Sequence, residues 1–187
     1  MKRSEAEHNS RERLILAGIN ELGEHGISDF SLRRVAAAAQ LSCAAPYRHF
    51  RDKDELILAI ISYIRKDWLL LCDSISTIYR ENPTERLLGL CAAAVRFWIG
   101  NGSFYSVLLA TSNGSAHRGE LSLFDTPIIE AVAEVEAEKG RELPTTAILA
   151  MLYGTVSLIC SGRLSANKGQ EDLRNYLTLL VLGKILL

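Results

Sequence analysis

Hydrophobic residues recur at intervals of three and four along most of this 187-residue chain, which is the spacing of helices that bury one face. The longest of these stripes predicts a helix over about residues 53–79. Its apolar positions are Ile57, Ile60, Ile61, Ile64, Trp68, Leu71, Cys72 and Ile75. Similar stripes, separated by breaks that contain glycine, proline or asparagine, predict an all-α fold of about nine helices.

A pair of short helices is predicted over residues 31–53. Ser31 is a good N-cap, because its hydroxyl can accept a free backbone N–H at the start of a helix. Apolar residues then follow at helical spacing, at Leu32, Val35, Ala36 and Ala39. The chain is expected to bend at residues 40–41, and Ser42 to cap a second helix that runs to about Phe50. This layout is that of a helix-turn-helix, whose second helix enters the major groove of DNA.

Basic side chains gather in the same segment. Residues 31–53 carry five arginine or lysine residues and one acidic residue, a net charge of +4, whereas the whole chain carries −1. Residues 1–53 sum to +2 and residues 54–187 to −3. A local excess of positive charge favours binding to phosphates, although a solvated basic face on an ordinary helical hairpin would carry the same charge.

Residues 11–56 resemble the DNA-binding head of the tetracycline-repressor (TetR) family of bacterial regulators. The resemblance rests on the segments LILAGINELGEHGI, FSLRRVA, the LS turn, YRHF and DKDEL. Gln40, Cys43 and Ala44 depart from the family pattern, and Gln40 stands where glycine is usual, so a positive φ there would be strained. Pro46 is expected in the first turn of the recognition helix, where a proline is tolerated.

The helix-turn-helix prediction and the resemblance together give a set of candidate DNA contacts. Ser31 and Arg33, at the start of the first of the two helices, are plausible phosphate donors. The resemblance implies contacts to the DNA backbone for Tyr47 and His49. Arg48 has two open roles, because a guanidinium can bind either O6 and N7 of a guanine or a phosphate. The candidates are Ser31, Arg33, Ser42, Cys43, Ala44, Ala45, Tyr47, Arg48, His49 and Lys53.

Further expectations concern both ends of the predicted recognition helix. Ala44 and Ala45 would present a small apolar surface that suits thymine methyl groups. Asp52 and Glu55 form a capping-box pattern at the start of the next helix. Lys53 lies in that first turn, where the helix dipole disfavours a cation, so we expect a bound phosphate beside it; a solvated turn is the alternative.

The chain before this segment divides into an arm and a helix. Residues 1–10 are expected to form a loose polar arm. A helix follows over about residues 10–25, and Gly26 suits its C-terminal end. We expect that helix to support the two following helices and to touch DNA little.

The prediction separates a DNA-binding domain over residues 1–53 from a ligand-binding and dimerisation body over residues 54–187. The elements expected in the body after its long first helix are a helix from Pro83 to about residue 100, a short helix at 103–111, a loop at 112–125 and a helix at 127–139. A loop of that length is long for a compact domain and is often functional.

The last two predicted helices, at about 144–163 and 170–187, are apolar round most of their circumference. Residues 145–162 contain no charge over 18 positions, which touches the length of a membrane span. The threonines and serines in this stretch, and the lack of a second such stretch, favour a helix buried on both sides instead. We expect the two helices to pack against those of a second copy as a four-helix bundle, and the resemblance implies the same homodimer.

Aromatic residues of the body are candidates for a ligand pocket, since aromatic walls near a polar group suit small organic molecules. Ordinary core packing is the alternative for each of them. No charged residue interrupts an apolar stripe, which favours an apolar or aromatic ligand over an anion. The candidates are Trp68, Trp98, Phe104, Tyr105, Phe124 and Tyr153.

Other kinds of site find little support in the sequence. The four cysteines and four histidines show no metal-ligand spacing, and there is no glycine-rich phosphate loop, H-E-x-x-H or G-x-S-x-G motif. We therefore expect no metal, cofactor or catalytic residue. The polar N-terminus and the scattered cysteines favour a reduced, cytoplasmic protein.

The sequence thus predicts a DNA-binding regulator of transcription, most simply a repressor that leaves an inverted-repeat operator when a small molecule binds its body. A constitutive DNA-binding regulator without a ligand is the first alternative. A helical small-molecule-binding protein or an enzyme is the second.

Overall fold

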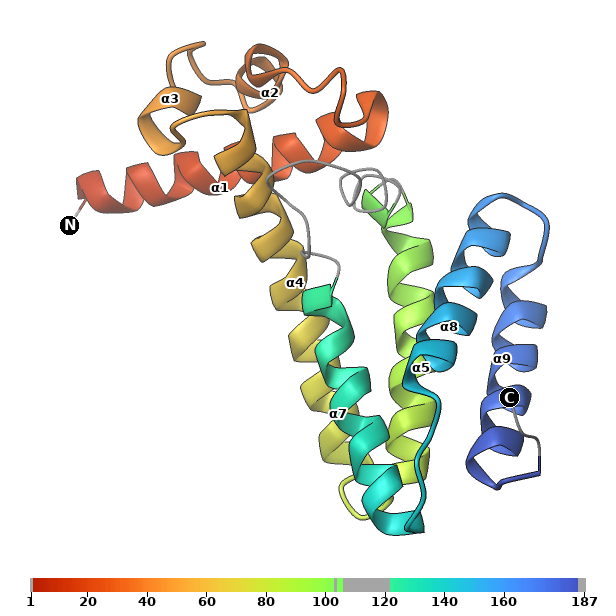
Figure 1. The fold of residues 1–187 in the computed structure, drawn as a ribbon. Helices are drawn as coiled ribbons and strands as arrows, with labels where there is room; N and C mark the ends of the chain where they lie inside the picture. Colours follow the sequence, from red (N-terminus) through yellow and green to blue (C-terminus); the bar gives the residue numbers. More distant parts are fainter. Residues whose placement is uncertain (1, 103, 106–121, 185–187) are drawn as a thin grey trace. The chain divides into compact units, whose positions relative to one another are not determined.

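The computed structural model describes residues 2–102, 104–105 and 122–184. Within these residues all regular structure is helical, as predicted (Figure 1). The helices are α1 (Lys2–His25), α2 (Leu32–Ala38), α3 (Pro46–His49), α4 (Lys53–Ile78), α5 (Pro83–Gly100), α7 (Ser122–Lys139), α8 (Thr145–Cys160) and α9 (Ala166–Val181). The short helix predicted at 103–111 lies largely outside the described residues.

The chain forms two compact units, and the boundary between them falls within α4, between Lys66 and Asp67. The first unit contains α1, α2, α3 and the first part of α4, and the second contains the rest of α4 with α5, α7, α8 and α9. Because α4 is one continuous helix, it supplies side chains to the cores of both units. The functional division expected at residue 53 remains a proposal.

In the first unit, α1 packs against α2 and α3. Gly18 lets α1 approach α4 closely, because a Cβ at this position would lie 2.6 Å from Cδ1 of Ile60. The largest fully buried side chains of this unit come from α1, α4 and the residue that ends α3. They are Leu14, Leu22, Phe50, Leu56, Ile57, Ile60 and Ile61.

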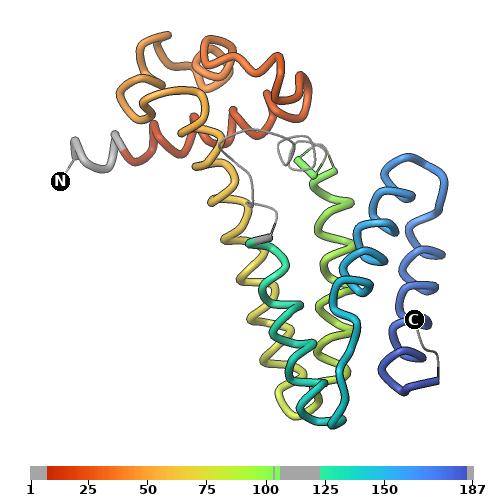
Figure 2. The backbone as a smooth tube through the Cα atoms, viewed as in Figure 1, coloured from red at the N-terminus to blue at the C-terminus, as the bar shows by residue number. Residues whose placement is uncertain are grey.

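In the second unit, α5 is the central helix and packs against α7, α8 and α9 (Figure 1). The pair α8 and α9 runs antiparallel through a short connection (Figure 2). Asn82 caps α5 by accepting the backbone N–H of Glu85 at 3.0 Å. The inward face of α5 is fully buried at Leu87, Cys91, Ala94, Val95 and Trp98.

The N-terminal arm predicted for residues 1–10 is wrong, because α1 already begins at Lys2. The segment contains no glycine or proline, and six of its ten residues are good helix formers, namely Met1, Lys2, Arg3, Glu5, Ala6 and Glu7. A polar sequence without an apolar stripe can therefore still extend a helix that is anchored further along the chain.

Helix α7 also begins earlier than predicted, at Ser122 instead of residue 127. The end of the loop predicted at 112–125 is therefore helical, and the rest of that loop lies outside the described residues. The prediction took Pro127 as a helix start, but it lies within the first two turns of α7. A proline there removes one backbone donor close to the helix end, where few such bonds are lost.

Helix α9 spans Ala166–Val181 instead of the predicted 170–187. Ser165 caps it by accepting the backbone N–H of Lys168 at 3.4 Å. Gly183, with a φ of +68°, turns the chain out of the helix. The prediction followed the apolar stripe and so missed both the polar first turn and this C-terminal signal.

The buried stripe of α4 is also narrower than predicted. Leu71 was expected in the core and is 38 % exposed, and its neighbours Leu69 and Leu70 are 38 % and 59 % exposed. Three consecutive residues spread over about 200° of a helix, so they cannot all face one core.

Candidate nucleic-acid interface

The turn that joins α2 to α3 is closed by two backbone hydrogen bonds. The N–H of Gln40 donates to the carbonyl of Ala37, and that of Leu41 to the carbonyl of Ala36, both at 2.9 Å. This is the pattern of a Schellman cap, which needs a left-handed residue. Gln40 is that residue, with a φ of +55°, so it adopts the conformation for which glycine is usual.

Helix α3 is shorter than predicted. Ser42 was expected to cap it, but the helix begins at Pro46 and its N-cap is Ala45, without a side-chain cap. Pro46 has no N–H to donate to the carbonyl of Ser42, so that carbonyl instead accepts the N–H of Ala45 at 2.8 Å. Residues 42–45 therefore form a turn that leaves Ser42, Cys43 and Ala44 exposed.

A buried carboxylate that sequence reasoning missed holds the start of α2. Glu21 on α1 is only 6 % exposed. It accepts the backbone N–H of Ser31 at 3.0 Å and Nε of Arg34 at 2.7 Å. Ser31 caps α2 as predicted, because its Oγ accepts the N–H of Arg34 at 3.4 Å. The signal for Glu21 in the sequence was its spacing, because it follows Leu14 by seven residues and Gly18 by three and so shares their face of the helix.

This network lowers the pKa of Glu21 and engages the guanidinium of Arg34, whose side chain is 42 % exposed. Burial pushes the pKa of the Glu21 carboxyl upwards, but the hydrogen bonds from Arg34 and Ser31 outweigh burial, so the pKa lies below its ordinary value. Arg34 also binds Asp29, through both its carbonyl and its carboxylate. The guanidinium of Arg34 is therefore committed within the unit.

The start of α4 has the predicted capping box in a slightly different form. Asp52 accepts the N–H of Glu55 at 2.9 Å, and Glu55 accepts the N–H of Arg51 at 2.6 Å, one residue earlier than the usual partner. Lys53 does not stand free in solvent, because its Nζ donates to the carbonyl of Ile27 at 2.5 Å. An ammonium has three donors, so Lys53 keeps the capacity to bind a phosphate.

Of the remaining candidate contacts, Arg33, Tyr47 and Arg48 face solvent and His49 is half-buried. Ala45 was expected to face the DNA groove but is only 8 % exposed, because it packs into the core of the unit. Tyr47 is 64 % exposed, and Arg33 and Arg48 are exposed as well. Within the described parts of the chain, these three side chains make no hydrogen bond or ion pair. Of the five basic residues in the segment, Arg33 and Arg48 therefore carry the charge that is most available to a ligand.

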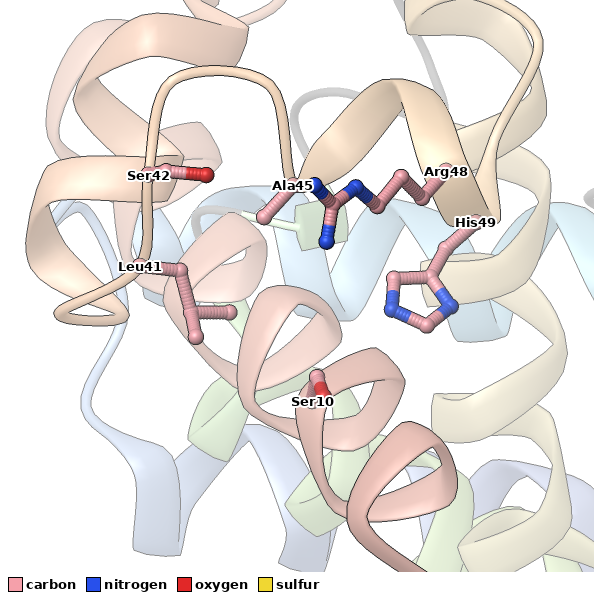
Figure 3. Close-up of a pocket in the computed structure, with 6 residues that line it drawn as sticks. All are labelled: Ser10, Leu41, Ser42, Ala45, Arg48 and His49. Atoms are coloured by element: carbon pink, nitrogen blue, oxygen red, sulfur yellow. The ribbon is translucent and has the colours of Figure 1, made fainter. Parts of the chain in front are cut away.

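A hollow of about 330 Å³ opens between α1 and α3 (Figure 3). It brings together four of the predicted candidates, and it adds one residue that the sequence analysis did not single out, Ser10. Figure 3 shows the guanidinium of Arg48 extending along α3 toward Ala45, and the imidazole of His49 pointing toward the helix that carries Ser10. The lining residues are Ser10, Leu41, Ser42, Ala45, Arg48 and His49.

In the second unit, three of the predicted ligand residues form one aromatic cluster. The indole N–H of Trp68 donates to the carbonyl of Phe124 at 3.0 Å. The ring centroids of Trp98 and Phe124 lie 4.9 Å apart, and Phe97 lies 5.2 Å from both tryptophans. Phe97 was not among the candidates, because successive residues lie about 100° apart round a helix and its neighbour Trp98 had been chosen. In the structure the two rings nevertheless meet edge to face. All but Phe97 are at most 3 % exposed.

The other three ligand candidates are less alike. Phe104 and Tyr105 are buried and are grouped with the first unit. Tyr153 is half-buried, and its hydroxyl donates to the carboxylate of Asp125. Burial raises the pKa of Asp125 against this hydrogen bond, which lowers it. A charged group thus lies next to the aromatic cluster in the chain, which the apolar stripes had not indicated.

Among the described residues, no group of three histidine, cysteine, aspartate or glutamate side chains is arranged to hold a metal ion. None of the helices in that part of the chain combines the length and hydrophobicity that a membrane crossing needs.

Burial raises the pKa of Cys72 and Cys91 to about 12, so both stay protonated thiols.

Both the sequence and the fold are similar to those of known bacterial regulators. The family model described as "Bacterial regulatory proteins, tetR family" matches residues 14–60. No curated protein matches the sequence. Several solved structures share the fold over nearly the whole chain. A TetR-like transcriptional regulator from Rhodococcus sp. RHA1 has a TM-score of 0.74 at 17 % identity, with 93 % of this chain and 96 % of that one covered.

Two other solved structures agree. A TetR family transcription regulator from Marinobacter aquaeolei has a TM-score of 0.68 at 17 % identity, with 97 % of both chains covered. A TetR family transcriptional regulator from Thermus thermophilus has a TM-score of 0.64 at 22 % identity, with 89 % of this chain and 93 % of that one covered. Residues 14–60 thus match the TetR family of bacterial regulatory proteins, and the whole chain has the fold of solved structures of that family.

Proposed function

We propose that this chain is a transcriptional repressor that binds an inverted-repeat DNA operator as a homodimer and leaves it when a small molecule binds the second unit. The observation that carries the proposal is the set of exposed donors on the helix-turn-helix. Tyr47, Arg33 and Arg48 face solvent and have no partner among the described residues. A long aromatic side chain and two arginines without internal partners suit contact with the DNA backbone and bases.

The proposed contacts depend on which hydrogen bonds each candidate side chain already makes within the protein. Arg33, Tyr47 and His49 are proposed to contact phosphates, and the exposed turn at Cys43 and Ala44 to face the groove floor, where Ala44 suits a thymine methyl. Ser31 is proposed as a weaker contact, because its hydroxyl and its N–H already have internal partners. Lys53 contributes its two unused N–H donors.

The proposed dimer rests on apolar side chains that the second unit leaves exposed on α8 and α9. Leu158, Leu179 and Leu182 are 42 %, 39 % and 56 % exposed. Gly154 on α8 has open space around it, with no atom within 4 Å of where its Cβ would lie. Pairing these faces with their copies would bury them in a four-helix bundle. Twofold symmetry would then set two recognition helices about 34–36 Å apart, one turn of DNA.

The proposed ligand response uses the second unit and α4. The aromatic cluster of Trp68, Trp98 and Phe124, with the Tyr153–Asp125 pair, provides apolar walls and a polar group. Trp68 lies on α4, which continues into the first unit, so a ligand that displaces Trp68 would act on the helix that follows α3. Coupling of this kind is typically worth about 1–3 kcal/mol.

The rival functions differ in what they predict. A constitutive regulator would bind operator DNA equally with and without any small molecule. An enzyme would need a catalytic group. The similarity to TetR-family regulators favours a regulator over an enzyme. Neither rival has a specific structural observation in its favour.

The experiment that tests the proposal is selection of duplexes from a random DNA library by the purified protein, followed by titration of the winner and a scrambled duplex at two salt concentrations. We expect an enriched inverted repeat, bound by a dimer far more tightly than the scrambled control. Equal, weak binding of both duplexes that disappears at moderate salt would reduce the interaction to nonspecific phosphate attraction and reject the proposal.

A further inference from the structure

The hollow between α1 and α3 has the chemical character of an anion site. Among the described residues that line it, Ser10, Ser42, Arg48 and His49 carry donor groups and none carries a carboxylate. Arginine gives a permanent positive charge, and the hydroxyls and imidazole add neutral donors that bind oxyanions well. The remaining walls are the apolar side chains of Leu41 and Ala45, which offer no competing acceptor.

The hollow also has suitable size and access. Its volume of about 330 Å³ is roughly ten times the volume of a water molecule, so it holds a phosphate group together with its bound water. Arg48 and Ser42 are exposed, and Ser10 and His49 are half-buried, so an anion can enter from the surface and meet donors at several depths. Figure 3 shows the side chains of Arg48 and His49 directed over the same space.

We propose that this hollow seats one backbone phosphate of bound DNA, and that Ser10 of α1 is a DNA contact in addition to the helix-turn-helix residues. The inference rests on the proposed DNA-binding function. The phosphodiester is the occupant that the surroundings favour, because the hollow includes Ser42 and Arg48 from the segment whose exposed donors suit DNA. Inorganic phosphate shares the same chemistry and is treated below as a competing source.

This assignment decides between the two roles that the sequence left open for Arg48. A guanidinium directed over the hollow would neutralise a phosphate and would not extend toward a base edge. Phosphate contacts fix the position of a protein on DNA but carry no sequence information. Base discrimination would then fall to the exposed turn at Cys43 and Ala44.

The test is a salt titration of DNA binding by wild type, Arg48→Gln and Ser10→Ala, on the selected operator and on each of its single-base variants. A phosphate seat predicts that Arg48→Gln weakens binding by about 10–100-fold, equally on every duplex. It also predicts that the slope of log K against log salt becomes shallower by about 1.8, because the dimer loses one phosphate contact in each half-site. Ser10→Ala is expected to weaken binding by about 2–10-fold without changing base preference.

Matched controls separate the seat from general effects. Ser28→Ala removes an exposed hydroxyl of the same unit outside the hollow, and Arg80→Gln removes an exposed cation after α4; both should bind DNA as wild type does. A methylphosphonate scan of the operator adds a direct readout. One neutralised phosphate per half-site should cost the wild type affinity and cost Arg48→Gln nothing, because the seat is already lost.

Two outcomes would reject the phosphate seat. If Arg48→Gln relaxes preference at one base pair and leaves the salt slope unchanged, Arg48 reads a base and the seat is wrong. If inorganic phosphate at constant ionic strength displaces DNA from wild type and Arg48→Gln alike, the competition does not act at this hollow and the seat is again rejected. Failure of the proposed function would look different, because the wild type would then prefer no duplex. The change in the slope of log K against log salt could still be measured on random DNA.

Discussion

In the first unit, charged side chains join the helix-turn-helix to its neighbours, whereas the second unit adds a buried aromatic cluster to its interhelical ion pairs, Arg86–Glu134 and Arg174–Glu85. Glu21 and Arg34 join α1 to α2, Lys53 joins α4 to the carbonyl of Ile27, and the guanidinium of Arg11 lies 5.2 Å from the ring centre of Phe50. These contacts commit much of the positive charge of a basic segment to its own fold. The unit therefore exposes a few selected donors and not a uniformly basic face.

The second unit differs in its core and in part of its surface. Its core is made of close aromatic and aliphatic packing, and among its exposed residues are the leucines Leu158, Leu179 and Leu182. The comparison teaches that exposure has opposite meanings in the two units. An exposed polar group without a partner marks the proposed DNA surface in the first, and exposed apolar groups mark the proposed dimer surface in the second.

The largest effect should come from removing an aromatic anchor of the second unit. Trp68→Ala is expected to lower the free energy of unfolding by about 3–5 kcal/mol, because it empties a site that is 1 % exposed and removes the indole hydrogen bond to the carbonyl of Phe124. Urea unfolding followed by circular dichroism measures this. Leu70→Ala, 59 % exposed on the same helix, is the control and should change little; equal losses would mean that α4 is not anchored by the cluster.

A charge on the proposed dimer surface should have the next largest effect. Leu179→Glu places two like charges across a twofold interface and is expected to weaken the dimer by roughly 3 kcal/mol. Sedimentation velocity at several protein concentrations gives the mass. The matched control is Leu16→Glu, which puts the same charge on a leucine that is 45 % exposed in the first unit and should leave the dimer intact. A dimer that survives Leu179→Glu would place the interface elsewhere.

Breaking the charged tie of the first unit should cost less. Glu21→Gln is expected to lower stability by about 1 kcal/mol, because the side chain of Arg34 is 42 % exposed and solvent screens the pair. DNA binding should weaken in parallel, since Ser31 loses a charged acceptor and the start of α2 loosens. Glu24→Gln, at an exposed position of the same helix, serves as the control. Unchanged stability and binding in Glu21→Gln would show that the tie is dispensable.

The same pair gives a pH dependence with a definite sign. The pKa of Glu21 in the folded protein lies below its ordinary value of 4.5, so the unfolded chain takes up a proton first as the pH falls. The stabilising contribution is therefore fully present above about pH 4.5 and is lost as the pH falls through the lower, folded value. Below that range wild type and Glu21→Gln should converge in stability, whereas a constant difference would assign the effect to packing.

The smallest predicted effect is a gain in stability. Gln40→Gly is expected to stabilise the protein by about 0.5–1 kcal/mol, because it relieves a left-handed backbone at a φ of +55°, partly offset by the greater freedom of glycine in the unfolded chain. The midpoint of thermal unfolding reports it. Ala38→Gly, in the last turn of α2, should destabilise by a similar amount. A loss of stability in Gln40→Gly would mean that its side chain makes a contribution that the turn geometry hides.

Local rules explain which elements were predicted correctly from the sequence. The caps at Ser31 and Asn82 and the capping box at the start of α4 depend on a few adjacent residues, so their helices began where expected. Boundaries failed where local rules compete. Pro127 is compatible with the first turn or the interior of a helix, and Pro46 blocks the hydrogen bond on which a cap at Ser42 depended.

What the sequence determined by itself was the helical fold, the helix-turn-helix segment and the left-handed strain at Gln40, because helical periodicity and turn chemistry depend on neighbours in the chain. Only the tertiary structure decided which charges are available. Arg33 and Arg34 are adjacent in the sequence, yet one faces solvent and the other is held by Glu21 on another helix. Ser10 reaches the hollow beside Arg48 in the same way. Partners that lie far apart in the chain meet only when the helices pack, so no local pattern announces them.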